Sequence, residues 1–135
     1  MSNIQQDPGS FRDPLSRVFV GADTVVRAFT EQGKADIDAV WSKKSIARAL
    51  ASGDLIESNI VEPASVGLGA PWAGAMTHPK VPFISYPYEW TFSMLKDAAL
   101  LQLQLTRETL ADGIGLKDAT PYNIQFIGSR PQFID

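Results

Sequence analysis

The chain contains no cysteine and a single histidine among its 135 residues. Without cysteine, disulfide bonds and thiolate metal sites are excluded. His78 lies in a stretch rich in glycine and proline and has no metal-ligating neighbours in sequence. A histidine-based metal centre and a Ser-His-Asp triad therefore have little support. The lack of disulfides is compatible with a reducing compartment, and we expect a cytoplasmic protein.

Positive charge is also scarce. Lysine and arginine number 12 against 15 acidic residues, the net charge is −3, and no basic block is present. Nucleic acids and anionic membrane surfaces attract proteins through clustered Lys and Arg. We therefore expect neither a nucleic-acid partner nor a membrane partner. Residues 1–6 lack the apolar centre of a signal peptide, and charged and amide side chains in residues 91–111 argue against a membrane span.

The apolar fraction of 44% and the charged fraction of 20% are those of an ordinary soluble globular protein. The length fits one domain or a piece of a larger one. Residues 1–16 hold prolines and glycine among polar residues and predict an extended arm, anchored by Phe11. β-Branched and aromatic residues in 17–20 and 24–29 predict a hairpin that turns at 21–23.

A helical pattern follows over residues 34–52, with a break that allows two short helices and with Gly53 as the C-terminal cap. Residues 55–62 are a further strand candidate. The glycines and prolines of 63–82 predict a long loop, and 81–86 predicts a buried strand.

A long helix is predicted over residues 91–111, capped by its first threonine and closed by Gly113. Its breadth of apolar residues predicts burial on more than one side. A final hairpin is predicted from 123–127 and 131–134, joined by Gly128-Ser129 in a type II′ turn. The main apolar face of the helix is predicted to hold Phe92, Leu95, Ala98, Ala99, Leu103 and Leu110.

The last twenty residues carry the most specific pattern. Asp118 precedes Asn123 by five positions, and Asp135 ends the hairpin that follows. Phosphoryl transfer from a nucleotide needs a carboxylate that accepts the hydroxyl proton and oxygen ligands that hold magnesium. Asp118 is the candidate catalytic base, Lys117 a candidate phosphate partner, and Asn123 and Asp135 are candidate metal ligands. The alternative is an ordinary Asx-type turn before a hairpin.

This loop and the elements before it resemble the layout of protein kinases and aminoglycoside-type phosphotransferases, which implies ATP and Mg²⁺ as cofactors. Arg27 stands where a kinase carries a lysine, although the two residues are not interchangeable. Tyr86 and Tyr88 stand at the hinge position, where aromatic rings would stack on adenine, or they form a packed corner. A glycine-rich phosphate loop is missing, so the sequence leaves open whether the chain is an enzyme.

Four segments resemble the N-terminal region of a bacterial family whose members are usually described as SAM-dependent methyltransferases, including nodulation-associated ones. The segments are residues 11–14, 81–90, 94–100 and 116–126. The resemblance implies that a methyltransferase domain, with its SAM, lies beyond Asp135, since no glycine-rich SAM loop occurs in these residues.

The sequence thus predicts an α+β fold, with an arm over 1–16 and a truncated, kinase-like module over 17–135. Three functional hypotheses follow. The first is an accessory or substrate-positioning module of a methyltransferase-like protein, whose partner is the downstream methyltransferase domain. The second is a nucleotide- and magnesium-dependent phosphotransferase half-site. The third is a protein-interaction module in which an exposed apolar side of the long helix causes self-association.

Overall fold

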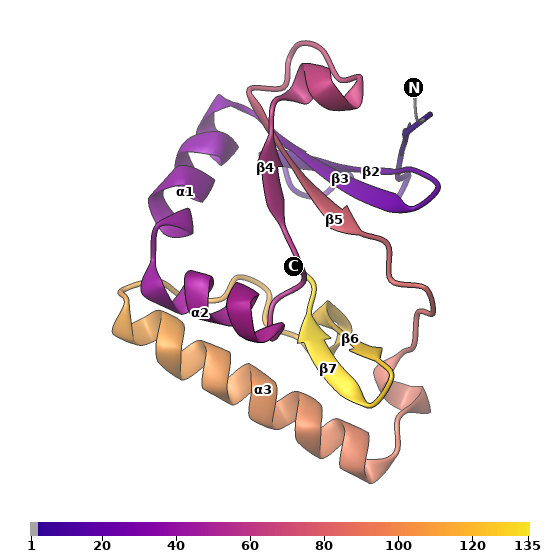
Figure 1. The fold of residues 1–135 in the computed structure, drawn as a ribbon, viewed down its shortest axis with the longest axis vertical. Helices are drawn as coiled ribbons and strands as arrows, with labels where there is room; N and C mark the ends of the chain where they lie inside the picture. The colour runs from indigo at the N-terminus through magenta and orange to yellow at the C-terminus, as the bar shows by residue number, and fades with distance from the viewer. Residues whose placement is uncertain (1–2) are drawn as a thin grey trace. The chain divides into compact units, whose positions relative to one another are not determined.

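The computed structural model describes residues 3–135, which fold into two compact units built from helices and antiparallel strands (Figure 1). The predicted α+β class is therefore confirmed. The first, which we call the sheet unit, comprises Met1–Ala39 and Glu57–Lys80. The second, the helix–hairpin unit, comprises Val40–Ile56 and Val81–Asp135. None of the helices in residues 3–135 has the length and apolar character needed to cross a membrane.

Within residues 3–135 the sheet unit holds a five-stranded antiparallel sheet in the order β1-β2-β3-β5-β4. The hairpin predicted in the first thirty residues is confirmed as β2 and β3, and the Gly21 N–H donates to the Thr24 carbonyl at 2.8 Å in its turn. Phe19, Val26, Ala28 and Ala75 form the buried centre of the sheet. The strands are β1 (Gln5–Gln6), β2 (Ser16–Val20), β3 (Thr24–Phe29), β4 (Asn59–Val61) and β5 (Gly74–Pro79).

The predicted long loop over 63–82 is wrong, because it contains a short 3₁₀ helix, η1 (Pro63–Val66), and the strand β5. β5 lies between β3 and β4, and its first three residues are buried. Its small residues and terminal proline carry little strand propensity, so pairing on both edges determines its structure. The strand predicted over 81–86 is also wrong: that segment is irregular, and only Ser85 in it is buried.

The N-terminal arm is held by hydrogen bonds to β2, and Phe11 remains exposed, so the predicted anchoring role of Phe11 is wrong. The Asp7 N–H donates to the Val18 carbonyl at 2.9 Å, and the Val18 N–H donates to the Ser10 hydroxyl at 2.9 Å. Gln5 and Gln6 add the edge strand β1 to the sheet. The first two residues of the predicted arm lie outside the described residues.

The helical segment predicted from residue 34 is two helices, α1 (Glu31–Trp41) and α2 (Lys44–Ser52). Gly53 ends α2 in the left-handed conformation, as predicted, with φ of 77°. α1 begins close to the segment before β2, since a Cβ atom on Gly33 would lie 2.5 Å from the Leu15 carbonyl oxygen. Only glycine allows this approach of the two backbones.

Gly33→Ala is therefore expected to lower the free energy of unfolding by about 1–3 kcal/mol through overpacking. The direction of the change in the free energy of unfolding tests the close approach, because replacing Gly by Ala in an unobstructed helix stabilises the protein by roughly 0.5–1 kcal/mol. Urea unfolding measures the change. Gly69→Ala is the matched control, since a Cβ at Gly69 meets nothing within 4 Å. An unchanged or raised midpoint for Gly33→Ala would contradict the close approach.

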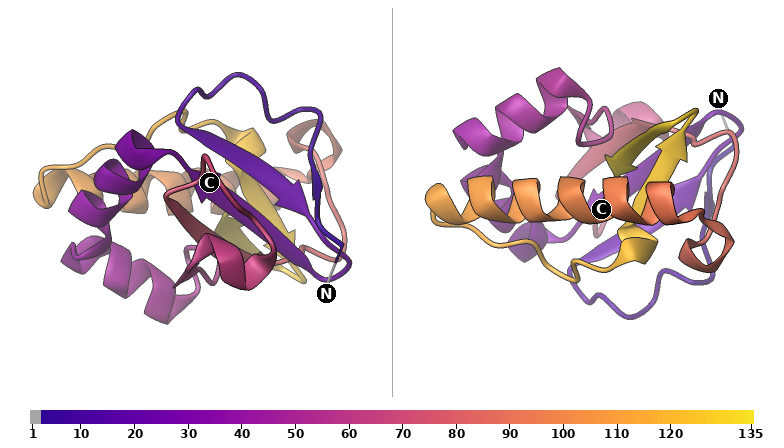
Figure 2. Two further views of the ribbon diagram at one scale, coloured as in Figure 1. Left: turned by 90° about the horizontal axis from the view of Figure 1, so that it is seen from above. Right: turned by 90° about the horizontal axis from the view of Figure 1, so that it is seen from below.

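In the helix–hairpin unit, α3 (Phe92–Ala111) lies beside the hairpin of β6 (Ile124–Ile127) and β7 (Arg130–Phe133), and packs against both β7 and α2 (Figures 1 and 2). The predicted helix and final hairpin are confirmed. The Thr91 hydroxyl caps α3 by accepting from the Met94 N–H at 3.3 Å. Gly128 turns the hairpin with φ of 62°, as a Gly-first turn requires.

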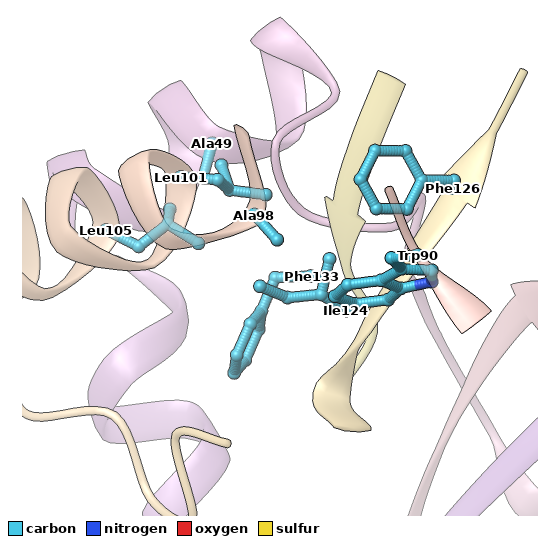
Figure 3. Close-up of a cluster of buried hydrophobic side chains, with 8 residues drawn as sticks. All are labelled: Ala49, Trp90, Ala98, Leu101, Leu105, Ile124, Phe126 and Phe133. Carbon is cyan, nitrogen blue, oxygen red and sulfur yellow. The ribbon is translucent and has the colours of Figure 1, made fainter. Parts of the chain in front are cut away.

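One buried cluster joins α3 to the hairpin (Figure 3). Leu101 and Ala98 project from α3 toward Ile124 and Phe133, and the Trp90 ring meets Phe126 edge-on with ring centroids 5.1 Å apart. The predicted main face of the helix is therefore wrong in part, because Phe92, Leu95, Ala99, Leu103 and Leu110 are exposed. The buried residues of α3 are Ala98, Leu101, Leu105 and Thr109.

Charged side chains fix the end of α2 within the same unit. Arg48 Nη1 donates to Asp54 at 2.8 Å and the same side chain forms an ion pair with Glu108 on α3. Burial alone raises the pKa of Asp54, but hydrogen bonds from Arg48 and Ser52 outweigh it and hold that pKa below its usual range. Asp112 at the end of α3 accepts from the Ser45 N–H at 2.7 Å, which lowers the Asp112 pKa and caps the start of α2.

We expect Asp54→Asn to destabilise the protein by roughly 1.5–3 kcal/mol at neutral pH, because it removes a charged hydrogen-bond partner whose side chain is only 17% exposed. A folded-state pKa below the unfolded value of about 3.9 contributes stability at higher pH, and that stability is lost as the pH falls through the folded-state pKa. The difference in the free energy of unfolding between wild type and variant, measured by chemical denaturation, should therefore disappear at acidic pH. Asp97→Asn, at an exposed position of α3, is the control. A gap that stays constant from pH 7 to pH 2 would refute the assignment.

Candidate functional site

The loop between α3 and the hairpin brings the predicted catalytic residues together. The Asn123 side-chain amide donates through Nδ2 to the Asp118 carbonyl at 2.5 Å, and the Thr120 N–H donates to the same carbonyl at 2.7 Å. Gln102 on α3 donates through Nε2 to the Ala119 carbonyl at 2.7 Å and ties the loop to the helix. Two side-chain amides therefore hold the adjacent carbonyls of Asp118 and Ala119 in the middle of the loop.

Asp118 itself is exposed and adopts φ of 50°, which makes it the non-glycine residue with left-handed backbone in residues 3–135. Asp and Asn tolerate that conformation better than other residues. Both the predicted catalytic role and the alternative Asx-type turn use such a residue, so the backbone alone does not separate them.

Asp135 follows directly from the hairpin register. The Ile134 N–H donates to the Asn123 carbonyl at 2.9 Å, so Ile134 lies opposite Asn123 and Asp135 is one residue beyond that pair. Asn123 donates to the Asp118 carbonyl through its Nδ2 group, and its Oδ1 atom remains as an acceptor. Within residues 3–135 no group of three His, Cys, Asp or Glu side chains has a metal-binding arrangement. A cation here would rely on Asn123 together with carboxylates and water.

The remaining candidates lie apart in the chain. Lys117 is exposed next to Asp118. Arg27 is half-buried in β3 of the sheet unit, where its backbone pairs with Val18 and Met76. Arg27 thus has a place in the sheet that fits a strand residue, whereas a hydrogen bond joins Asn123 to the Asp118 carbonyl within the helix–hairpin unit.

Tyr86 and Tyr88 form an exposed aromatic pair. Their rings stack with centroids 5.5 Å apart and an angle of 5° between the planes, and the side chains remain 44% and 76% exposed. Partial desolvation, followed by the negative charge of Glu89, raises the pKa of Tyr88 above its usual range. The two rings contact each other and solvent, whereas Trp90 of the same segment is buried.

This corner is anchored by a network that sequence analysis missed. Gln125 on β6, which is buried, accepts from the Ser85 N–H at 2.9 Å and donates to the Ser85 carbonyl at 3.0 Å. The Trp90 indole N–H donates to the Ser85 hydroxyl at 2.9 Å. Glu89 accepts from the Tyr86 N–H at 2.8 Å. A glutamine at an inward-facing strand position was the sequence signal for this network, because buried polar groups need partners.

The exposed face of α3 also differs from the sequence prediction, which assigned several of its residues to the main apolar face. Phe92, Ala99, Leu103 and Leu110 follow one another by seven, four and seven residues and are all exposed. At about 100° per residue they form one stripe, on the side of the helix away from Leu101 and Leu105. Leu95 and Leu100 widen it. We call these six residues the outer stripe.

The chain is similar to one curated protein, described as "Nodulation protein NoeA" from Rhizobium meliloti (strain 1021), at 41% identity over 128 residues. The match covers 94% of this chain but 26% of that protein, so the chain spans about a quarter of the length of its relative. No known protein-family model and no solved structure matches the chain.

The resemblance to a methyltransferase family, with a kinase-like catalytic loop, is therefore wrong as an assignment. Neither a methyltransferase nor a kinase family matches the chain, and the relative is described as a nodulation protein, with neither activity in its name.

Proposed function

We propose that this chain is an accessory docking module, whose outer stripe on α3 binds another part of a longer protein. The observation that carries the proposal is the exposure of apolar side chains along one line of the helix: Phe92 is 83% exposed, Leu103 67% and Leu110 63%. Contiguous apolar surface of this kind marks an interaction site.

The energetic argument follows from the size of these side chains. Burying one large apolar side chain contributes roughly 1.5–3 kcal/mol. Three such residues together contribute roughly 4.5–9 kcal/mol against an association cost of about 4–15 kcal/mol, so a stable contact also needs the other residues of the outer stripe. The opposite face of α3 is already covered by the hairpin and α2, so the helix is fixed before any partner binds. A preorganised surface of this kind loses little conformational entropy on binding.

The R. meliloti relative suggests which polypeptide binds the outer stripe. This chain corresponds to 26% of the R. meliloti protein, and the other three quarters of that protein provide the polypeptide that we propose to cover the outer stripe. The self-association predicted from the sequence is the competing occupant of the same surface. The accessory role is thus kept from the first hypothesis, without a methyltransferase.

Leu103→Asp is expected to weaken binding at least tenfold, or by about 1.4 kcal/mol, because it places a carboxylate in the centre of the outer stripe. The probe is the part of the R. meliloti protein outside the matched region, expressed separately, and calorimetry gives the dissociation constant. Gln104→Asp, exposed one position further on, is the control for charge. Circular dichroism and the unfolding midpoint should stay unchanged. Equal affinity of wild type and Leu103→Asp would refute the docking surface.

A second candidate function is magnesium-dependent phosphoryl transfer at the loop of Asp118 and Asn123, within the kinase-like order of elements. The specific support is the hydrogen bond from Asn123 to the Asp118 carbonyl, which fixes the loop and leaves the Asn123 Oδ1 atom for a cation. Asp118 would accept the proton of the attacking hydroxyl, with Lys117 near the phosphates, Asp135 as a second ligand, and Tyr86 and Tyr88 stacking on the base.

If this second candidate holds, the chain binds Mg²⁺–ATP in calorimetry, and Asn123→Ala weakens the binding at least tenfold because a cation ligand is lost. Asn59→Ala on β4 is the control, since its exposed amide contacts Glu57 alone among the described hydrogen bonds. The absence of heat at millimolar Mg²⁺–ATP, or equal affinity of Asn123→Ala, would eliminate the phosphoryl-transfer candidate.

A further inference from the structure

We propose that the partner segment on the outer stripe is an amphipathic helix whose apolar face carries two acidic side chains, one opposite Lys96 and one opposite Arg107. This inference rests on the docking function proposed above and adds the chemistry of the partner. It is carried by the positions of the two cations on α3 and by the lack, among residues 3–135, of any ion pair to either of them.

Both cations lie within the outer stripe. Lys96 follows Phe92 by four residues and precedes Leu100 by four. Arg107 follows Leu103 by four residues and precedes Leu110 by three. Residues three or four apart are neighbours on a helix surface, so each cation stands between exposed apolar side chains.

Neither cation is neutralised within the described part of the chain. Lys96 and Arg107 are exposed, and no hydrogen bond or ion pair among residues 3–135 involves either of them. The acidic residues of α3 that are closest in sequence, Asp97 and Glu108, do not pair with these cations. Glu108 pairs with Arg48 on α2, and Asp97 lies about 100° further round the helix than Lys96. Covering the stripe with an apolar surface alone would bury two unpaired positive charges, which is costly.

A second copy of the chain is a poor occupant for the same reason. An antiparallel pair centred between Leu101 and Gln102 would put Lys96 of one copy opposite Arg107 of the other, and a parallel pair would put each cation opposite itself. Like charges in contact across an interface disfavour that pairing. In these two registers, which overlap the stripes of both copies most fully, a partner of opposite charge is favoured over a second copy.

The spacing defines the partner further. Lys96 and Arg107 are eleven residues apart, which is about 16 Å along a helix at 1.5 Å per residue. A partner helix lying along α3 would match them with Glu or Asp about three turns apart, on the edge of an i, i+4, i+7, i+11 apolar stripe. Helix-on-helix docking with charged flanks is a common mode of peptide recognition.

The test uses the full chain and two synthetic helical peptides with the same leucine stripe, one carrying Glu and one carrying Lys at the two flanking positions. Fluorescence anisotropy should show at least tenfold tighter binding of the Glu peptide, with affinity falling as salt is raised. The double variant Lys96→Glu/Arg107→Glu should reverse the order. The control Arg12→Glu/Lys80→Glu makes the same change in net charge within the sheet unit and should leave the order unchanged.

The remaining outcomes of the peptide experiment distinguish failure of the acidic partner from failure of the docking surface. Equal binding of both peptides that Leu103→Asp abolishes would overturn the acidic partner and retain the docking surface. Binding of neither peptide would overturn the helical partner, and the R. meliloti polypeptide would then decide the proposed function independently. Concentration-dependent dimerisation in light scattering that Leu103→Asp removes would identify a second copy as the occupant and overturn this inference.

Discussion

The packing of α3 on the β6–β7 hairpin is the contact on which the helix–hairpin unit depends. Ile124 is completely buried at its centre, and Leu101, Leu105 and Phe133 surround it. Close packing around such a residue leaves no freedom to rotate α3 about its axis. The same contact therefore determines which side chains of α3 face outward, and the outer stripe is a consequence of the core. The loop of Asp118 is constrained likewise, because Gln102 on α3 and Asn123 before β6 donate to the adjacent carbonyls of Ala119 and Asp118.

The two functional proposals place different demands on this unit. Docking on the outer stripe needs a rigid helix with one face covered, and the core provides that. Phosphoryl transfer needs charged groups that converge on one point, and within the helix–hairpin unit a hydrogen bond joins Asn123 to the Asp118 carbonyl. We place the docking proposal first because the outer stripe lies entirely on α3, within one unit.

Local signals in the sequence predicted the elements whose structure is local. The hairpin of β2 and β3, the cap at Gly53, the cap of α3 and the final Gly-first turn all follow from residues next to one another in the chain. β5 could not be predicted in this way, because it gains its strand structure from β3 and β4, which are distant in sequence. The buried face of α3 failed for a related reason. Leucines line the helix on both sides, so only the position of the hairpin decides which side is covered.

In the candidate site, spacing predicted that Asp118 and Asn123 would meet, but not that an amide would join them. The buried pairing of Gln125 with Ser85 was outside the reach of local patterns, since forty residues separate the two. That pairing has a consequence for how the chain can vary. The side chain of Gln125 bonds to both backbone groups of Ser85, as a neighbouring strand would do. Residues along a strand alternate between its two faces. An insertion or deletion of one residue in β6 would present Ile124 or Phe126 to Ser85 and leave its peptide groups without partners. This pairing therefore constrains the position of Gln125 within β6, whereas the exposed side chains of the hairpin are not involved in it.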